Sequence, residues 1–138
     1  MYNTTMADQY SNNALSEKLG IKDNYDIAII NEPKNYFKLL GNLSQTILAR
    51  NLSGKKLDLI HFFPKNRQDL EIEFPKLKKN LKLDGILWIS WRKGSKNDLN
   101  ENKVMRIGLA NGLVDVKVIT IDKIWSALKF VYRLKDRK

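Results

Sequence analysis

Basic and aromatic residues follow several predicted strands of the chain, where they could bind a negatively charged ligand. The segments that contain them are 64–67, 92–97 and 122–126. Ammonium and guanidinium groups bind carboxylates and phosphates, and an indole ring can stack on a planar ring. The residues predicted to form the site are Lys65, Arg67, Trp91, Arg92, Lys93, Asp122, Trp125 and Ser126, with Lys96 and Lys123 adding positive charge beside them.

Of the three tryptophans, Trp91 is the best candidate for stacking on a ligand. Trp88 and Trp91 lie three residues apart in one predicted strand, so their side chains should point to opposite faces of the sheet. Packing in the core accounts for Trp88 and is also the expected role of Trp125.

The remaining titratable groups offer little catalytic chemistry. His61 is the only histidine, and it ends an apolar strand beside Phe62 and Phe63. Without a nearby Ser or Cys elbow it has no nucleophile to activate, so we expect a hydrogen-bonded residue of the core or the rim. Glu32 and Asp122 could perform acid–base chemistry if they face each other, or they could pair with nearby lysines. With no cysteine and one histidine, the common zinc sites are excluded.

The motifs of the common cofactor-dependent enzymes are absent. A nucleotide-binding sheet normally has glycines after its first strand, but this chain has Asn31-Glu32-Pro33-Lys34-Asn35 and no glycine until Gly41. The acidic residue that would bind a ribose after the second strand is replaced by Arg50-Asn51-Leu52. The Walker, GxSxG and HExxH patterns are also missing. We therefore expect no bound cofactor and no conventional dehydrogenase, kinase or hydrolase.

The composition is typical of one folded domain. The chain has 138 residues, of which 43% are hydrophobic and 29% charged. We expect a disordered tail over residues 1–12 and a single domain over 13–138. No apolar run approaches the roughly 20 residues that span a membrane, and the first residues do not resemble a signal peptide, which predicts a cytoplasmic protein without a membrane partner.

The net charge of +10 comes entirely from residues 55–138. This asymmetry favours an anionic partner, whether a small molecule or a nucleic acid. A lysine-rich, well-solvated surface would explain it too.

Apolar runs predict strands over 25–30, 46–52, 57–63, 86–91, 114–121 and 127–132. Helical spacing predicts helices ending at Gly20 and Gly41, a helix after Asn66 and another after Asp98. This alternation indicates a mostly parallel sheet whose last two strands form an antiparallel hairpin. We expect a kink or restart at Pro75, a turn at Asp84-Gly85, and a capping box of Asp98 with Glu101. The ligand site should lie at the carboxyl ends of the strands.

Several segments resemble an uncharacterised bacterial family known only as a domain of unknown function. These segments are KLGIK (18–22), LDGILWISWRK (83–93), DLNE (98–101), GLVDVKV (112–118) and WSALKFV (125–131). The resemblance covers nearly all of the chain after Ser11. The chain departs from the family at Trp91-Arg92-Lys93-Gly94, where the family has Trp-Pro-Lys-Lys.

More distantly, the region from residue 57 to the end resembles the second half of a Rossmann-type methyltransferase. The resemblance implies a three-layer Rossmann-like fold in which the last strand is inserted antiparallel beside its neighbour. It does not carry over the methyl-donor site, because the glycine loop and the ribose-binding acid have no counterparts.

Three functions are compatible with these observations. The leading hypothesis is a non-catalytic module that binds an anionic ligand or partner at the carboxyl edge of the sheet. The second is a methyltransferase-like enzyme that depends on S-adenosylmethionine through a degenerate site, with Glu32, Asp122 or Lys93 in a pocket roofed by Trp91. The third is a nucleic-acid-binding protein; its binding residues would be Lys76, Lys79 and Lys82 on a helix and Arg133, Lys135, Arg137 and Lys138 in the tail.

Overall fold

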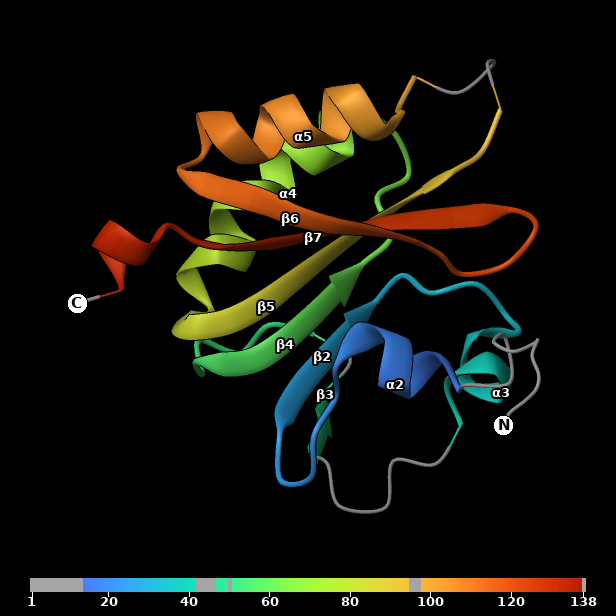
Figure 1. Cartoon of the computed structure of the whole chain (residues 1–138), viewed down its shortest axis with the longest axis horizontal. Helices are drawn as coiled ribbons and strands as arrows, with labels where there is room; N and C mark the ends of the chain where they lie inside the picture. Colours follow the sequence, from blue (N-terminus) through green and yellow to red (C-terminus); the bar gives the residue numbers. More distant parts are fainter. Residues whose placement is uncertain (1–13, 42–46, 50, 95–97, 138) are drawn as a thin grey trace.

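A six-stranded sheet forms the centre of the part of the chain that the structure describes (Figure 1). The structure is a computed structural model, and it describes residues 14–41, 47–49, 51–94 and 98–137. The strands are β2 (Asp26–Ile30), β3 (Ile47–Ala49), β4 (Leu57–Phe62), β5 (Leu81–Arg92), β6 (Leu113–Thr120) and β7 (Trp125–Tyr132). Their order in the sheet is β3-β2-β4-β5-β7-β6.

Strands β3, β2, β4 and β5 are parallel, and β7 runs antiparallel to both of its neighbours. The predicted mostly parallel sheet with a C-terminal antiparallel hairpin is therefore confirmed. The last strand lies between β5 and β6, as the distant resemblance implied. Arg92 at the end of β5 pairs with Trp125 at the start of β7, which places the β6–β7 turn at the carboxyl edge of the parallel strands.

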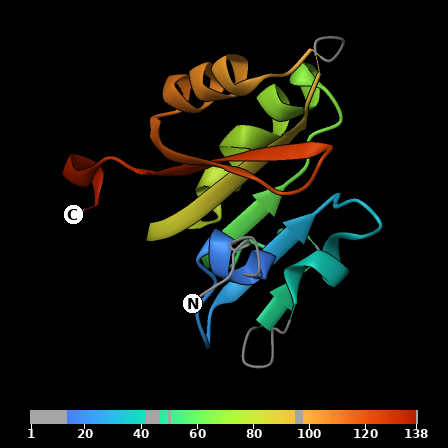
Figure 2. The ribbon, with the colours of Figure 1, turned by 45° about the vertical axis from the view of Figure 1, so that its right-hand side comes forward.

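Helices cover both faces of the sheet and make three layers (Figures 1 and 2). The short helices α2 (Leu15–Leu19) and α3 (Tyr36–Leu40) lie on one face, and α4 (Arg67–Lys79) and α5 (Glu101–Ala110) on the other. A short 3-10 helix, η1 (Leu134–Asp136), follows β7. Trp88 belongs to the core on the α2 side and Trp91 to the core on the α4 side, so the predicted opposite orientation of the two indoles is confirmed. None of the helices in the described ranges is both long and apolar enough to cross a membrane.

Helix α4 begins where Asn66 was predicted to cap it. The Asn66 side chain accepts a hydrogen bond of 2.8 Å from the backbone N–H of Asp69, which satisfies one of the free donors of the first turn. The helix then continues through Pro75, so the predicted restart does not occur. Proline removes one backbone hydrogen bond, but the buried side chains of Phe74 and Leu77 hold the helix against the sheet on both sides of it.

The predicted turn at Asp84-Gly85 is wrong, because both residues lie within β5. The strand begins at Leu81, whose side chain is buried, and its register with β4 jumps between Leu81 and Ile86. A Cβ atom on Gly85 would lie 2.8 Å from Leu81 Cδ1 and 3.0 Å from a backbone oxygen. The glycine therefore permits an irregular strand where the sequence pattern indicated a chain reversal.

The predicted capping box at Asp98 is also wrong. Asn100 caps α5 instead, and its side chain accepts a hydrogen bond of 2.9 Å from the backbone N–H of Lys103. The Asp98 carboxylate accepts hydrogen bonds of 3.1 and 3.2 Å from the Arg67 N–H at the start of α4. Asp98 thus connects the loops before α4 and α5. The predicted tail over 1–12 and Lys96 lie outside the described residues.

Candidate functional site

A cavity of about 310 Å³ opens at the carboxyl edge of the sheet. From β2 the chain passes to β3 on one side and then to β4 on the other, and a ligand crevice is expected where the connections diverge in this way. The loops after β2, β4 and β5 all contribute to the cavity. The residues that line it are Asn31, Phe63, Pro64, Lys65, Trp91, Arg92, Asp98, Leu99 and Trp125.

The aromatic wall of the cavity is built on the α2 side of the sheet. The half-buried Trp125 and the buried Phe63 form a T-shaped ring contact, with 5.2 Å between ring centroids and an interplanar angle of 86°. Phe63 in turn stacks on His61 at 4.3 Å. The guanidinium carbon of Arg92 lies 5.7 Å from the Trp125 ring centroid, within the range of a cation–π contact. These contacts fix the orientation of the indole.

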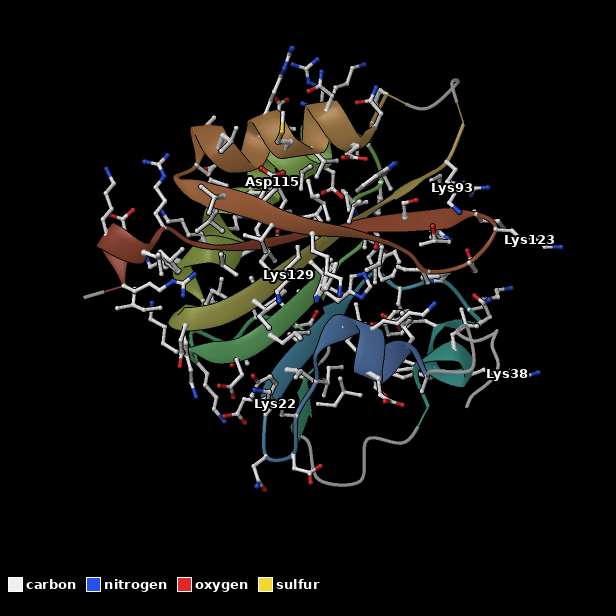
Figure 3. The ribbon with its side chains drawn as sticks, viewed as in Figure 1. Lys22, Lys38, Lys93, Asp115, Lys123 and Lys129 are labelled. Carbon is white, nitrogen blue, oxygen red and sulfur yellow. The ribbon has the colours of Figure 1, made fainter. Side chains whose placement is uncertain are left out.

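The basic residues of the site differ in whether their side chains already form hydrogen bonds within the protein. Lys65 is exposed, and its ammonium group has no hydrogen bond or ion pair with any described residue. The Lys93 ammonium donates a 2.8 Å hydrogen bond to the backbone oxygen of Asp122. Figure 3 shows Lys93 and Lys123 at the same end of the molecule, beside the β6–β7 turn. Among the described residues, Lys65 and Arg92 are the cations that line the cavity itself.

Asp122 holds the backbone of the β6–β7 turn. One of its carboxylate oxygens accepts hydrogen bonds of 2.8 Å from the N–H groups of Ile124 and Trp125, and the other receives a 3.5 Å bond from Asn35. Asp98 likewise accepts hydrogen bonds from a backbone N–H, at the start of α4. The arrangement positions Trp125 at the mouth of the site.

His61 is hydrogen-bonded inside the core, as predicted, but a serine lies beside it. Its Nδ1 atom is 2.7 Å from the Tyr36 hydroxyl and its Nε2 atom 2.6 Å from Ser90 Oγ. Burial lowers the pKa of His61 to about 3, so the ring is neutral near pH 7. Burial raises the pKa of Tyr36, and the charge of Glu32 adds to this effect. All three side chains of the network are inaccessible to solvent, which keeps Ser90 away from any substrate.

Four of the eight residues predicted for the site line the cavity: Lys65, Trp91, Arg92 and Trp125. Trp91 is only 7% exposed, whereas Trp125 is half-buried, so Trp125 offers more of its ring than the residue predicted as the better stacking candidate. Lys93 and Asp122 belong to the adjoining turn. Half-buried Ser126 pairs with Trp91 across β5 and β7.

The remaining residue, Arg67, lies elsewhere. It is 3.6 Å from Glu71 and lines a separate groove between α4 and α5 with Lys103 and Arg106. Five lining residues were not predicted for the site: Asn31, Phe63, Pro64, Asp98 and Leu99. The sequence pattern had assigned Phe63 to an apolar strand and Asp98 to a helix cap. Of these five, only Asn31 had a signal in the sequence. An asparagine directly after a strand indicates a sharp change of chain direction, because asparagine tolerates the left-handed backbone found there, with φ at 66°.

Solved structures of several methyltransferases share this arrangement of strands and helices. A methyltransferase from Aquifex aeolicus that depends on S-adenosylmethionine matches with a TM-score of 0.59 and 14% identity, over 84% of this chain and 86% of that one. The magnesium protoporphyrin IX methyltransferase of Synechocystis PCC 6803 matches with a TM-score of 0.60 and 9% identity, over 86% and 76%. A further methyltransferase of this cofactor class, from Corynebacterium glutamicum, matches with a TM-score of 0.55 and 10% identity, over 86% of each chain.

The chain has a methyltransferase-like Rossmann fold. The identities are too low to show more than the fold. No family model matches the chain and no curated protein matches its sequence, so the resemblance to an uncharacterised bacterial family stays a prediction.

The loop after β2 does not fit S-adenosylmethionine in the way that glycine loops hold nucleotides. The loop has Glu32 and Pro33 where glycines would let the protein backbone come close to a bound nucleotide. The Asn31 amide donates a 2.7 Å hydrogen bond to the Phe63 carbonyl, which closes the loop over the neighbouring strand. Helix α3, which follows this loop, has only five residues, and the side chain of its Tyr36 is buried in the core on the α2 side. No methyl-transfer step is therefore assigned to these residues.

Proposed function

We propose that this protein is a non-catalytic binding module of the cytoplasm that holds a small anionic ligand, with a planar ring, at the carboxyl edge of its sheet. The observation that carries the proposal is the combination of Trp125, Lys65 and Arg92 around one cavity. An indole face binds a planar ring, and the two cations bind a carboxylate or phosphate attached to it.

The charge balance of the cavity supports this choice of ligand. The described part of its lining contains two cations, Lys65 and Arg92, and one carboxylate, Asp98, which already accepts hydrogen bonds from the start of α4. Lys93 and Lys123 raise the positive potential beside the opening (Figure 3). A cavity of about 310 Å³ is at the lower end of the size range of small-molecule sites.

A non-catalytic function is supported by what the polar groups already do. Asp98 and Asp122 hold backbone N–H groups, and His61 and Ser90 are inaccessible. The loop after β2 does not offer the glycines that would admit a methyl donor. The shared fold favours a degenerate methyltransferase as the second candidate, and the same experiment separates the two.

Isothermal titration with three related compounds tests the proposal. Adenosine monophosphate supplies both ring and anion, adenosine supplies only the ring, and S-adenosylmethionine is the methyl donor. We expect adenosine monophosphate to bind, and adenosine to bind at least about tenfold more weakly, because a charge-assisted hydrogen bond contributes roughly 1.5–3 kcal/mol.

Variants of the cations give the matched comparison. Lys65→Glu and Arg92→Glu should each weaken binding of adenosine monophosphate by about tenfold or more, whereas Lys135→Glu, in η1 after β7, should leave it unchanged. Equal affinity for adenosine and its monophosphate, or no effect of Lys65→Glu, would refute the proposal. Micromolar binding of S-adenosylmethionine would favour the enzyme instead.

A further inference from the structure

Three lysines lie together on the α2 side of the sheet, away from the cavity described above. Lys117 in β6 is directly opposite Lys129 in β7, and Lys129 is opposite Trp88 in β5. The buried Trp88 indole donates a 2.9 Å hydrogen bond to the carbonyl of Leu19 in α2, which identifies the face on which these side chains lie. Lys18 of α2 is the third lysine. Figure 3 labels Lys129 on the sheet.

A groove of about 500 Å³ separates α2 from the edge strand β6. It is lined by Glu17 and Lys18 of α2 and by Lys117, Ile119 and Thr120 of β6. Lys129 lies on the neighbouring strand, beside Lys117. Among the described residues, the groove therefore has lysines on both of its walls and one carboxylate, Glu17.

None of the three lysines has an ion pair or a side-chain hydrogen bond to a described residue, and Glu17 has no ion pair within the same part of the chain. Like charges directly opposite each other in a sheet are unfavourable, so the pair formed by Lys117 and Lys129 is a position where a bound anion would relieve repulsion. The positive charge here is thus available for a partner.

On the α4 side of the sheet, two of the lysines are already paired with carboxylates. On and next to α4, Lys76 pairs with Glu73 at 3.4 Å and Lys82 with Asp58 at 2.9 Å. These are two of the three lysines that the sequence suggested for binding nucleic acid through a helix. The unpaired lysines on the α2 side are therefore the better candidates for binding an anionic partner.

We propose that the groove between α2 and β6, with Lys129 beside it, binds the phosphodiester backbone of single-stranded nucleic acid. Lysine ammonium groups suit phosphates as point charges. A groove bounded by a helix and a strand can hold a single nucleic-acid strand. A flat lipid bilayer could not reach the bottom of such a groove. The lining residues that the structure describes include no aromatic side chain, so binding should depend little on base sequence. This site is independent of the anion site proposed at the carboxyl edge.

Fluorescence anisotropy with labelled RNA and DNA strands of mixed sequence, about 12 nucleotides long, tests the proposal. The full chain should bind both, and the double variant Lys117→Gln/Lys129→Gln should bind about tenfold more weakly or worse. Its slope of log affinity against log salt should be shallower by about 1.4, because each lost phosphate contact contributes about 0.7 for a single strand. The control Lys76→Gln/Lys79→Gln removes the same charge from the α4 side and should change affinity by no more than about twofold.

Further measurements distinguish this groove from the cavity at the carboxyl edge and from a membrane-binding surface. Circular dichroism should show that both double variants are folded. Excess adenosine monophosphate should not displace the nucleic-acid strand from the groove. If adenosine monophosphate does not bind the carboxyl edge, the proposed function fails but the expected binding of nucleic acid to the groove does not change. Three outcomes would overturn the proposal: no binding at low salt, equal losses in the two double variants, or a variant-sensitive interaction with phosphatidylserine vesicles and none with nucleic acid.

Discussion

Burial of its only histidine should make this protein sensitive to mild acid. His61 has an ordinary pKa of 6.5 when the chain is unfolded, and burial lowers it to about 3 in the folded state. The folded state therefore resists protonation that the unfolded state accepts. This contribution to stability is fully present above pH 6.5, falls as the pH drops below 6.5, and is lost by about pH 3.

The magnitude follows from the pKa difference. Each pH unit below 6.5 costs about 1.4 kcal/mol until the folded-state pKa is reached, so the loss at pH 4.5 is about 3 kcal/mol. For a chain of this length, that loss corresponds to a fall in Tm of roughly 10 °C. It is also a large fraction of the roughly 5–15 kcal/mol that stabilises a typical domain.

Thermal unfolding at pH 7.0, 5.5 and 4.5, followed by circular dichroism, measures the effect. The control is His61→Gln, which retains a donor and an acceptor toward Tyr36 and Ser90 but cannot titrate. We expect this variant to be less stable than the original at pH 7 and to lose less stability between pH 7.0 and 4.5. Parallel losses in the two proteins, or an imidazole proton resonance that titrates near pH 6.5 in the folded state, would refute the reasoning.

Three further predictions concern stability and can be checked by thermal or urea unfolding. Gly108→Ala should destabilise the protein by about 1–3 kcal/mol, because the new Cβ would overlap the ring of buried Phe130; a higher Tm would show that helix propensity outweighs the packing. Lys117→Glu should stabilise it by roughly 0.2–1 kcal/mol by replacing repulsion of Lys129 with attraction, and the gain should shrink at high salt. Asn66→Ala should cost about 1 kcal/mol through loss of the α4 cap, and an unchanged midpoint would contradict that assignment.

Much of the fold could be predicted because its central strands are buried on both faces. The runs 57–63 and 86–91 are apolar almost throughout, and they form β4 and most of β5. Short connections and the alternation of helix and strand then determine which loops share the carboxyl edge. Lys65, Arg92 and Trp125 could be selected on that basis alone.

The rest depended on geometry that local patterns do not contain. Ser90 contacts His61 because β4 and β5 pair in a particular register, with His61 opposite Trp88, and no local signal gives the register of parallel strands. Arg67 lies away from the cavity because the rotation of α4 about its axis points it toward Glu71. Gly85 indicated a turn, although packing of Leu81 keeps the chain extended there.

The position of β7 has a consequence for how the chain folds during synthesis. This strand is the last of the sheet to be made, yet it lies between β5 and β6 and provides the backbone partners of both. Until residue 132 has left the ribosome, β6 has no neighbour to bond with and the Phe130 ring is missing from the space between α5 and the sheet. We therefore expect nascent chains that stop short of β7 to expose α5 and β6 and to need a chaperone, whereas chains that include β7 can close this sheet.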